Sequence, residues 1–344
     1  MTNRIGILTG GGDCPGLNAV IRAVVRRAEQ RNINCFGFRN GWAGVLKMQV
    51  EPLTISSTRG ILHRGGTILG TSRVDPLREP GGVDRIREAL DIHGLDGLIV
   101  VGGEGTLSAA TRLATDEGIP LVGIPKTIDN DVGGTNLTVG FTTAVGIATA
   151  AVDRLHSTAE SHNRVMVLEV MGRHAGWIAT YAGMAGGADA ILIPEFNFDI
   201  AAVCRHIKHR AGSGRDFSIV VVAEGARPAE GTMAMPEYEE DQFGRPVLGG
   251  ISHVIAREIE GRTSFPARVT ILGHVQRGGS PHPADRVLAT RFGVEAVELA
   301  RGGEWGTMTG LIGQHVEAVA LQDATKELKQ VPRDLYEIAE TFFG

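Results

Sequence analysis

A short acidic segment contains the residues best suited to catalysis. Thr127-Ile128-Asp129-Asn130-Asp131 places two carboxylates two residues apart after an apolar run, so an extended backbone would point both to one side. A sugar hydroxyl is a poor nucleophile at neutral pH, and phosphoryl transfer to it needs a positioned base. We predict that Asp129 is that base. A turn or cap formed by the Asp and Asn side chains is the alternative interpretation.

A glycine-rich loop, Gly10–Gly16, lies between the apolar run Ile5–Thr9 and a helix pattern over Leu17–Gln30. Such a loop can present backbone N–H groups and a helix N-terminus to phosphate, although it could also serve only a tight turn. It is neither the GxGxxG of dinucleotide-binding folds nor the GxxxxGK[ST] of P-loops. The sequence therefore gives no support to a dehydrogenase or to a P-loop enzyme.

A second glycine loop, Gly102-Gly103-Glu104-Gly105-Thr106, repeats this design with a carboxylate at the bend. Magnesium that bridges nucleotide phosphates usually takes one or two protein carboxylates and keeps its waters. Glu104 is therefore our candidate magnesium ligand. The alternative is that Glu104 only stabilises the first turn of the following helix.

Arginines beside glycine- or histidine-rich segments suggest a phosphorylated substrate, because guanidinium groups bind phosphates bidentately and neutralise transition-state charge. His274 could donate to a sugar hydroxyl or be a structural histidine, and the sequence does not separate these roles. The five arginines are Arg73, Arg164, Arg173, Arg268 and Arg277.

These residues need a scaffold, and the pattern of the chain predicts parallel β/α units. Apolar strands over Ile5–Thr9, Gly97–Val101 and Pro120–Ile124 each end in one of the loops above, and parallel strands bring such loops to one sheet edge. A second group of strands indicates a further α/β domain, with a surface excursion over Ala229–Pro246 and a helix-compatible tail over Gln322–Gly344. Those strands are Val165–Val170, Ala190–Ile193, Phe217–Ala223 and Arg268–Leu272.

The composition fits a globular enzyme that acts on small molecules. The 344 residues are 42% hydrophobic and 21% charged, with a net charge of -5 and no basic run, which argues against nucleic-acid binding. Three scattered cysteines offer no disulfide framework, and no window approaches a membrane span. Met1–Arg4 leads directly into a strand without a signal peptide, so we expect a cytoplasmic protein.

Several of these motifs, in this order, resemble those of the bacterial 6-phosphofructokinases, specifically an ATP-dependent, actinobacterial-type mixed-substrate group. The resemblance spans about residues 4 to 310. It implies a glycolytic phosphotransferase with two α/β domains, each a mainly parallel sheet flanked by helices. A larger phosphoryl-donor domain would comprise 1–139 and 254–305, and a smaller sugar-phosphate domain 140–253 and 306–344. The motifs are Gly10–Asn18, Gly102–Thr106, Pro125–Asp131, Met171–Arg173 and Gly273–Pro281.

The resemblance also implies roles for individual residues, with Asp129 as the base and Glu104, where the family usually has an aspartate, on magnesium. Arg164 and Arg268 match arginines donated by a neighbouring subunit, so the active site would be complete only in a homo-oligomer, a tetramer or in some relatives a dimer. Catalytic residues would be Thr127, Asp129, Asp131, Arg73 and Arg173. Donor contacts would be Gly11, Ser72, Arg73, Gly103, Glu104, Gly105, Thr106 and Lys126. Fructose 6-phosphate contacts would be Thr127, Asp129, Arg164, Met171, Gly172, Arg173, Glu224, Arg268, His274 and Arg277.

Two positions disagree about the phosphoryl donor. In the family, glycine at position 105 accompanies ATP use, because a larger acidic residue there would occupy the space of the α-phosphate. Lys126 favours pyrophosphate, since a lysine at this place is typical of the pyrophosphate-dependent branch. An absent side chain leaves room for ATP, whereas a lysine can swing aside. We therefore predict ATP, with pyrophosphate as the alternative donor.

A non-catalytic sugar-phosphate or nucleotide sensor on the same fold is the remaining alternative. Such a sensor would be expected to have lost the base or the metal carboxylate. Both Asp129 and Glu104 are present, and the sequence therefore favours an enzyme.

Overall fold

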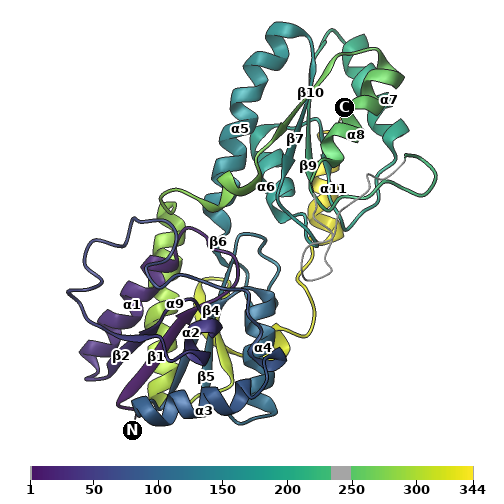
Figure 1. The fold of residues 1–344 in the computed structure, drawn as a ribbon. Helices are drawn as coiled ribbons and strands as arrows, with labels where there is room; N and C mark the ends of the chain where they lie inside the picture. Colours follow the sequence, from purple (N-terminus) through teal and green to yellow (C-terminus); the bar gives the residue numbers. More distant parts are fainter. Residues whose placement is uncertain (1, 234–248, 344) are drawn as a thin grey trace. The chain divides into compact units, whose positions relative to one another are not determined.

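The computed structural model describes residues 2–233 and 249–343, which form two compact units (Figure 1). Unit 1 comprises Met1–Thr143 and Arg277–Lys329, and unit 2 comprises Ala144–Gln276 and Gln330–Gly344. The chain therefore passes between the units three times, and each unit is built from segments far apart in the sequence.

The sheet of unit 1 has the strand order β12-β11-β5-β4-β1-β2-β3, with the short β6 paired to β5. Its central strands are parallel, and only the edge strands β3 and β12 run antiparallel to their neighbours. The bounds are β1 (Arg4–Thr9), β2 (Asn34–Phe38), β3 (Val50–Leu53), β4 (Gly97–Gly102), β5 (Leu121–Thr127), β6 (Val139–Gly140), β11 (Thr307–Ile312) and β12 (His315–Ala320).

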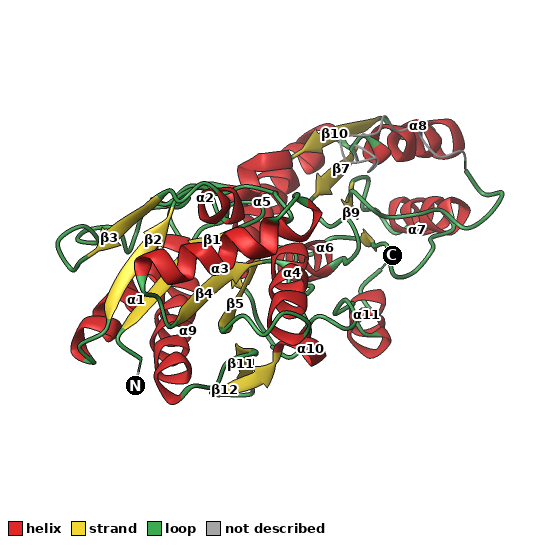
Figure 2. Ribbon diagram, turned by 60° about the horizontal axis from the view of Figure 1, so that its bottom comes forward, coloured by secondary structure: helices red, strands yellow, loops and turns green. Residues whose placement is uncertain are grey.

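Helices cover this sheet, which explains why β4 is buried along its whole length (Figure 2). Leu8, Leu98 and Val100 of the sheet share one core with α2, α3 and α4. Helix α9 packs against α1 and against β4, β5 and β11. The helices of unit 1 are α1 (Leu17–Gln30), α2 (Trp42–Leu46), η1 (Pro76–Arg78), α3 (Gly82–His93), α4 (Glu104–Thr115), α9 (Pro283–Gly302) and α10 (Leu321–Ala324).

Unit 2 contains a four-stranded, all-parallel sheet of order β10-β7-β9-β8. Val167, Val220 and Val222 of this sheet form a core with α7 and α8, and α6 and α11 pack against β8. Its strands are β7 (Val165–Val170), β8 (Ala190–Leu192), β9 (Ser218–Ala223) and β10 (Ala267–Ile271). Its helices are α5 (Phe141–His162, which begins in unit 1), α6 (Trp177–Gly186), α7 (Ile200–Gly212), α8 (Ile251–Thr263), η2 (Gly273–Arg277) and α11 (Arg333–Glu340).

The expected domain boundaries differ from those of the two units. Residues 254–276 were assigned to the larger domain, but β10 pairs with β7 in the register Ala267↔Val165 and therefore belongs to unit 2. Residues 306–329 were assigned to the smaller domain, but β11 pairs with β5 and belongs to unit 1. In both cases backbone hydrogen bonding to a sheet decides the membership, and only residues 330–344 of the tail lie in unit 2.

The predicted fold class, two mainly parallel α/β sheets flanked by helices, is confirmed. The predicted surface excursion over 229–246 falls largely on residues 234–248, outside the described ranges. Among the helices that the structure describes, none combines the length and apolar character needed to cross a membrane.

Candidate active site

Three adjacent strands of unit 1 bring the predicted catalytic loops to one sheet edge. The carboxyl ends of β1, β4 and β5 lie side by side, with Thr9 opposite Val101 and Gly102 opposite Pro125. The Gly10–Gly16 loop, the Gly103–Thr106 loop and the Thr127–Asp131 loop follow these strand ends. Because the chain leaves β1 for β2 on one side and then for β4 on the other, this is a crevice position where parallel sheets bind ligands.

The glycine loop after β1 is held by hydrogen bonds to two other segments, one containing Thr71 and Ser72 and one containing Lys126. The Gly11 N–H donates to the Ser72 carbonyl at 2.9 Å, and the Thr71 hydroxyl donates to the Gly11 carbonyl at 2.5 Å. Lys126 Nζ donates to the carbonyls of Gly10 and Gly12, at 2.9 and 2.6 Å. These hydrogen bonds order the loop in the absence of a ligand. A phosphate that binds to it therefore loses little free energy to ordering the loop.

Lys126 is one of the largest fully buried side chains in the protein, with 2% of its surface exposed. Burial lowers the pKa of its ammonium group from the ordinary value, and the nearby Cys14 thiol, when ionised, opposes this shift. The sequence suggests a lysine that can swing aside, but the structure shows one held by two carbonyls. Its firmest role is to hold the glycine loop in place.

Carboxylates from two loops affect one another electrostatically. Asp131 has a pKa raised from 3.8 to about 7, first by burial, next by the neighbouring Asp129 carboxylate and further by Glu104, while Lys329 lowers it. Within the described residues, the buried Oδ1 of Asp131 accepts no hydrogen bond. The Asp129 N–H donates to the Thr127 hydroxyl at 3.1 Å. Mutual repulsion of this kind is relieved by a divalent cation, so the donor set fits magnesium.

Glu104 and Gly105 form the exposed first turn of α4. The Ser108 hydroxyl donates to Glu104 Oε1 at 3.1 Å. A Cβ built on Gly105 would meet no described heavy atom within 4 Å, so this glycine leaves open space beside the turn. Thr106, in contrast, is buried, and its side chain would touch a Cβ placed on Gly10 or Gly102 at 2.7 and 2.4 Å. Thr106 therefore packs beneath the two glycine loops.

Arg73 and Arg277 approach the glycine loop from two further segments. Arg73 is exposed and follows Ser72, whose carbonyl holds Gly11. Arg277 donates to the Asp13 carbonyl at 3.2 Å, and its guanidinium lies only 2.7 Å from where a Gly12 Cβ would stand. A side chain at position 12 would therefore displace the Arg277 guanidinium from its present place beside the loop.

Unit 2 has five of the predicted sugar-phosphate residues, Met171, Gly172, Arg173, Glu224 and His274, after the carboxyl ends of β7, β9 and β10. The Gly225 N–H donates to the Gly172 carbonyl at 3.1 Å, which joins the Met171-Gly172-Arg173 loop to the segment containing Glu224. The Gln276 side chain accepts from the Met171 N–H and donates to the Gly273 carbonyl, at 3.3 and 3.1 Å. His274 is exposed in the same turn, η2.

Arg164 and Arg268 lie at the opposite end of this sheet. Arg164 directly precedes β7, and Arg268 is the second residue of β10, paired with Met166. Six residues of β7 separate Arg164 from Met171, a span of about 20 Å. Arg268 already forms an ion pair with Glu260 at 3.2 Å. Within a single copy of the chain, the unit 2 sheet therefore keeps Arg164 and Arg268 far from Arg173.

The model of the family described as phosphofructokinase matches residues 4–300 of this chain. The chain belongs to the phosphofructokinase family. A pyrophosphate–fructose 6-phosphate 1-phosphotransferase of Streptomyces coelicolor is 53% identical over 99% of this chain and 100% of its own length. An ATP-dependent 6-phosphofructokinase of Mycobacterium tuberculosis is also 53% identical, with the same coverage. Overall identity therefore does not choose between the two phosphoryl donors.

A solved structure supports the family assignment at the level of the fold. The phosphofructokinase of Saccharomyces cerevisiae superimposes with a TM-score of 0.80 at 30% sequence identity. The match covers 99% of this chain and 46% of the yeast chain. Both units of this chain are therefore included in the likeness.

Two polar side chains that position the site were not predicted as functional. Asn18 is buried and donates to the carbonyls of Arg64 and Gly65, both at 3.1 Å, so it shapes the segment leading to Arg73. Gln276 is also buried and fixes the Met171 loop. Both amides lie within glycine-rich motifs, and this was the sequence feature that could have pointed to them. Their hydrogen-bond partners, however, are distant in the sequence and are known only from the fold.

Proposed function

We propose that this phosphofructokinase transfers the γ-phosphoryl group of ATP to the 1-hydroxyl of fructose 6-phosphate, giving fructose 1,6-bisphosphate. The observation that carries the proposal is the convergence of the glycine loop, the Glu104 turn and the Thr127–Asp131 loop on three adjacent parallel strands. This convergence supports the proposal, because backbone that can bind phosphate and a carboxylate that can accept a proton follow neighbouring strand ends.

In the proposed reaction Asp129 accepts the proton of the 1-hydroxyl as the bond to phosphorus forms. Thr127 and Asp131 flank it, and the Thr127 hydroxyl already receives the Asp129 N–H, which fixes the backbone of the base. Arg73 and Arg173 are the arginines proposed to neutralise charge on the transferring group. The proposed fructose 6-phosphate contacts are Met171, Gly172, Arg173, Glu224, His274 and Arg277.

Magnesium is the expected metal of this reaction, and Glu104 is its proposed protein ligand. When bound, the ion would neutralise part of the phosphate charge. The shifted pKa of Asp131, caused in part by Asp129 and Glu104, supports a cation in this neighbourhood. The described residues contain no cluster of three or more His, Cys, Asp or Glu side chains arranged for a metal, as expected where phosphates and waters supply most ligands.

ATP is the proposed donor because Gly105 leaves open space at the first turn of α4. Pyrophosphate is the second candidate, supported by Lys126 and by the names of close relatives such as the one in Streptomyces coelicolor. However, Lys126 is buried, and its ammonium group already donates to two carbonyls of the glycine loop. The lysine therefore has a structural role that does not require pyrophosphate. We therefore place more weight on Gly105.

A homo-oligomer, with a tetramer as the proposed form, would complete the sugar-phosphate site. Arg164 and Arg268 lie at the opposite end of the unit 2 sheet from Arg173, so their proposed contact with fructose 6-phosphate would come from a neighbouring copy. Mixing an inactive Arg164→Ala chain with an inactive Asp129→Asn chain should restore part of the activity. No recovery in the mixed oligomer would contradict the shared site.

The function is tested by incubating the purified protein with fructose 6-phosphate, ATP and magnesium. We expect ADP and fructose 1,6-bisphosphate in equal amounts, measured by ³¹P NMR and by coupling to aldolase. The Asp129→Asn variant, which keeps the size and polarity of the side chain, is the matched control for contaminating kinase. Absence of bisphosphate with ATP would overturn the proposal, and formation of bisphosphate with pyrophosphate alone would establish the second candidate donor.

A further inference from the structure

The loop that contains Asp129 and Asp131 has an unusual backbone and needs support. Asn130 adopts a left-handed conformation with φ of 52°, and its amide holds the loop closed by donating to the Asn136 carbonyl at 3.3 Å and accepting from the Thr138 N–H at 3.0 Å. Left-handed asparagine is tolerated but not favoured. Contacts from outside the loop therefore have to maintain this shape.

One set of contacts comes from β11 and α10 and fixes the far part of the loop. The Leu311 N–H donates to the Thr135 hydroxyl at 3.0 Å, and the Asn136 N–H donates to the Leu311 carbonyl at 2.8 Å. The Gly133 N–H donates to the Ala324 carbonyl at 3.1 Å. These bonds hold residues 133–136 but do not reach the two aspartates.

The second set of contacts comes from one residue of the tail, Lys329. Its backbone N–H donates to the Asp131 carbonyl at 2.9 Å, while Nζ donates to the carbonyls of Thr135 and Asn136 at 2.8 and 3.0 Å. Lys329 thus bridges the Asp131 end of the loop and its far end. Burial lowers the pKa of Lys329 to about 8, and the charge of Asp131 opposes that shift.

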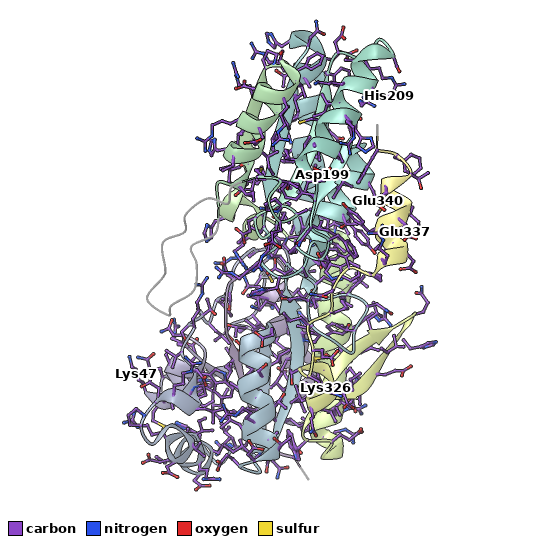
Figure 3. The ribbon with its side chains drawn as sticks, turned by 90° about the vertical axis from the view of Figure 1, so that its right-hand side faces the viewer. Lys47, Asp199, His209, Lys326, Glu337 and Glu340 are labelled. Carbon is purple, nitrogen blue, oxygen red and sulfur yellow. The ribbon has the colours of Figure 1, made fainter. Side chains whose placement is uncertain are left out.

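The ammonium group of Lys329 stabilises the loop both as a positive charge and as a hydrogen-bond donor. Two carbonyl acceptors that converge on one ammonium group would otherwise face each other with like partial charges. Nearby Lys326 offers a contrast, because it is exposed in the same segment and no hydrogen bond of its side chain is found among the described residues (Figure 3). Of the two lysines, only Lys329 is built into the catalytic loop.

We propose that Lys329 is a positioning residue for phosphoryl transfer: it joins both ends of the Asp129–Asn136 loop and thereby holds Asp129 in the geometry of a general base. The expected effect of Lys329 on kcat rests on the proposed function, whereas its effect on the order of the loop does not. The tail, which the sequence leaves without a role, is in this account a strap across the catalytic loop. The backbone hydrogen bond to Asp131 fixes the tail segment against one end of the loop, and the ammonium group binds the other end at Thr135 and Asn136.

The test compares Lys329→Met, which keeps an unbranched side chain only one atom shorter but removes its charge and donors, with Lys326→Met as matched control. We expect Lys329→Met to lower kcat about tenfold, equivalent to about 1.4 kcal/mol, with the KM for fructose 6-phosphate within about twofold of wild type. Lys329→Arg, whose guanidinium can also donate to two carbonyls, should recover most of the lost kcat. Lys326→Met should behave as wild type.

Hydrogen–deuterium exchange of the oligomer without substrate provides an independent readout. In Lys329→Met, amides of residues 129–138 should exchange about tenfold faster while the strands β1 and β4 keep their protection. This measurement holds whether or not the protein phosphorylates fructose 6-phosphate, so failure of the proposed function is recognised separately. Should Lys329→Met fail to fold, Lys329→Gln replaces it in both experiments. A kcat within about twofold of wild type, unchanged exchange in the loop, or no rescue by arginine would each overturn the proposal.

Discussion

Replacing Gly105 by aspartate should stabilise the fold and impair ATP use at the same time. Gly105 is the second residue of α4, its φ lies outside the left-handed region, and a side chain there meets no described atom within 4 Å. An acidic residue in the first helical turn contributes about 0.3–1 kcal/mol, and loss of glycine flexibility in the unfolded chain adds about 0.4–1 kcal/mol. We expect a total of about 1 kcal/mol and a Tm about 1–2 °C higher.

The same side chain would enter the space proposed for the α-phosphate of ATP. A carboxylate about 5 Å from one phosphate charge opposes binding by about 3 kcal/mol at an effective dielectric constant of about 20, or roughly a hundredfold in Kd. Pyrophosphate has no α-phosphate attached to a nucleoside, so its use should change far less. The variant should therefore be more stable, poor with ATP and little altered with pyrophosphate.

The assay measures KM and kcat for each donor at saturating fructose 6-phosphate, together with thermal unfolding. Gly105→Asn, which has the shape of aspartate without its charge, separates steric exclusion from electrostatic repulsion. A Gly105→Asp enzyme whose KM for ATP stays within about threefold of wild type would refute the placement of ATP beside this turn. A lower Tm would refute the structural part of the reasoning.

Three further predictions concern the carboxylates. Asp129→Asn should lower kcat by about 10² to 10⁴ with little change in sugar-phosphate binding, and near-normal kcat would end its assignment as the base. Glu104→Gln should raise the magnesium concentration needed for half-maximal rate, whereas an unchanged titration would contradict a metal role. Asp131→Asn should raise stability by about 1 kcal/mol or more at pH 8. Because the folded carboxyl of Asp131 has a pKa of about 7 against an ordinary 3.8, stability is lost as pH rises between these values, so the gain should shrink towards pH 4.

The parallel strands of the fold could be predicted from the sequence because each is a short apolar run ending in a glycine-rich or polar loop. The helix Leu17–Gln30 and the strand Val165–Val170 were predicted with the bounds that the structure has. The edge pair β11 and β12 was not predicted, because β12 alternates exposed and partly exposed residues and gains its place only by pairing with β11. The bounds of the two units differ from the expected domain bounds for the same reason, because unit membership depends on long-range strand pairing.

The site was predicted by residue type and by place at strand ends, but not by its supports. Asp129, Glu104 and the glycine loop follow strands that prove to be neighbours. Lys126 was interpreted as a donor ligand, yet its burial beneath the glycine loop depends on packing between β5 and the loop after β1. Lys329 carries no motif at all, since its partners are backbone carbonyls that only the fold brings within reach.

The helix α11 of the tail has exposed contacts that the sequence pattern suggests and a buried contact that only the fold shows. The helix-compatible pattern of the tail is realised in the end of α10 and in Arg333–Glu340. In the second of these helices Arg333 forms ion pairs with Glu337 and Glu340, both at 3.0 Å (Figure 3). These exposed pairs contribute little to stability. The buried contact of the same helix is the Tyr336 hydroxyl on the Ile191 carbonyl at 2.6 Å, which no sequence pattern reveals.

The central claim is transfer from ATP to fructose 6-phosphate, and the most direct measurement compares donors on one enzyme preparation. The kcat/KM for ATP and for pyrophosphate should be determined side by side at saturating fructose 6-phosphate and magnesium, with fructose 1,6-bisphosphate as the measured product. The open space at Gly105 predicts that ATP gives the higher kcat/KM. Turnover with pyrophosphate and none with ATP would contradict the account.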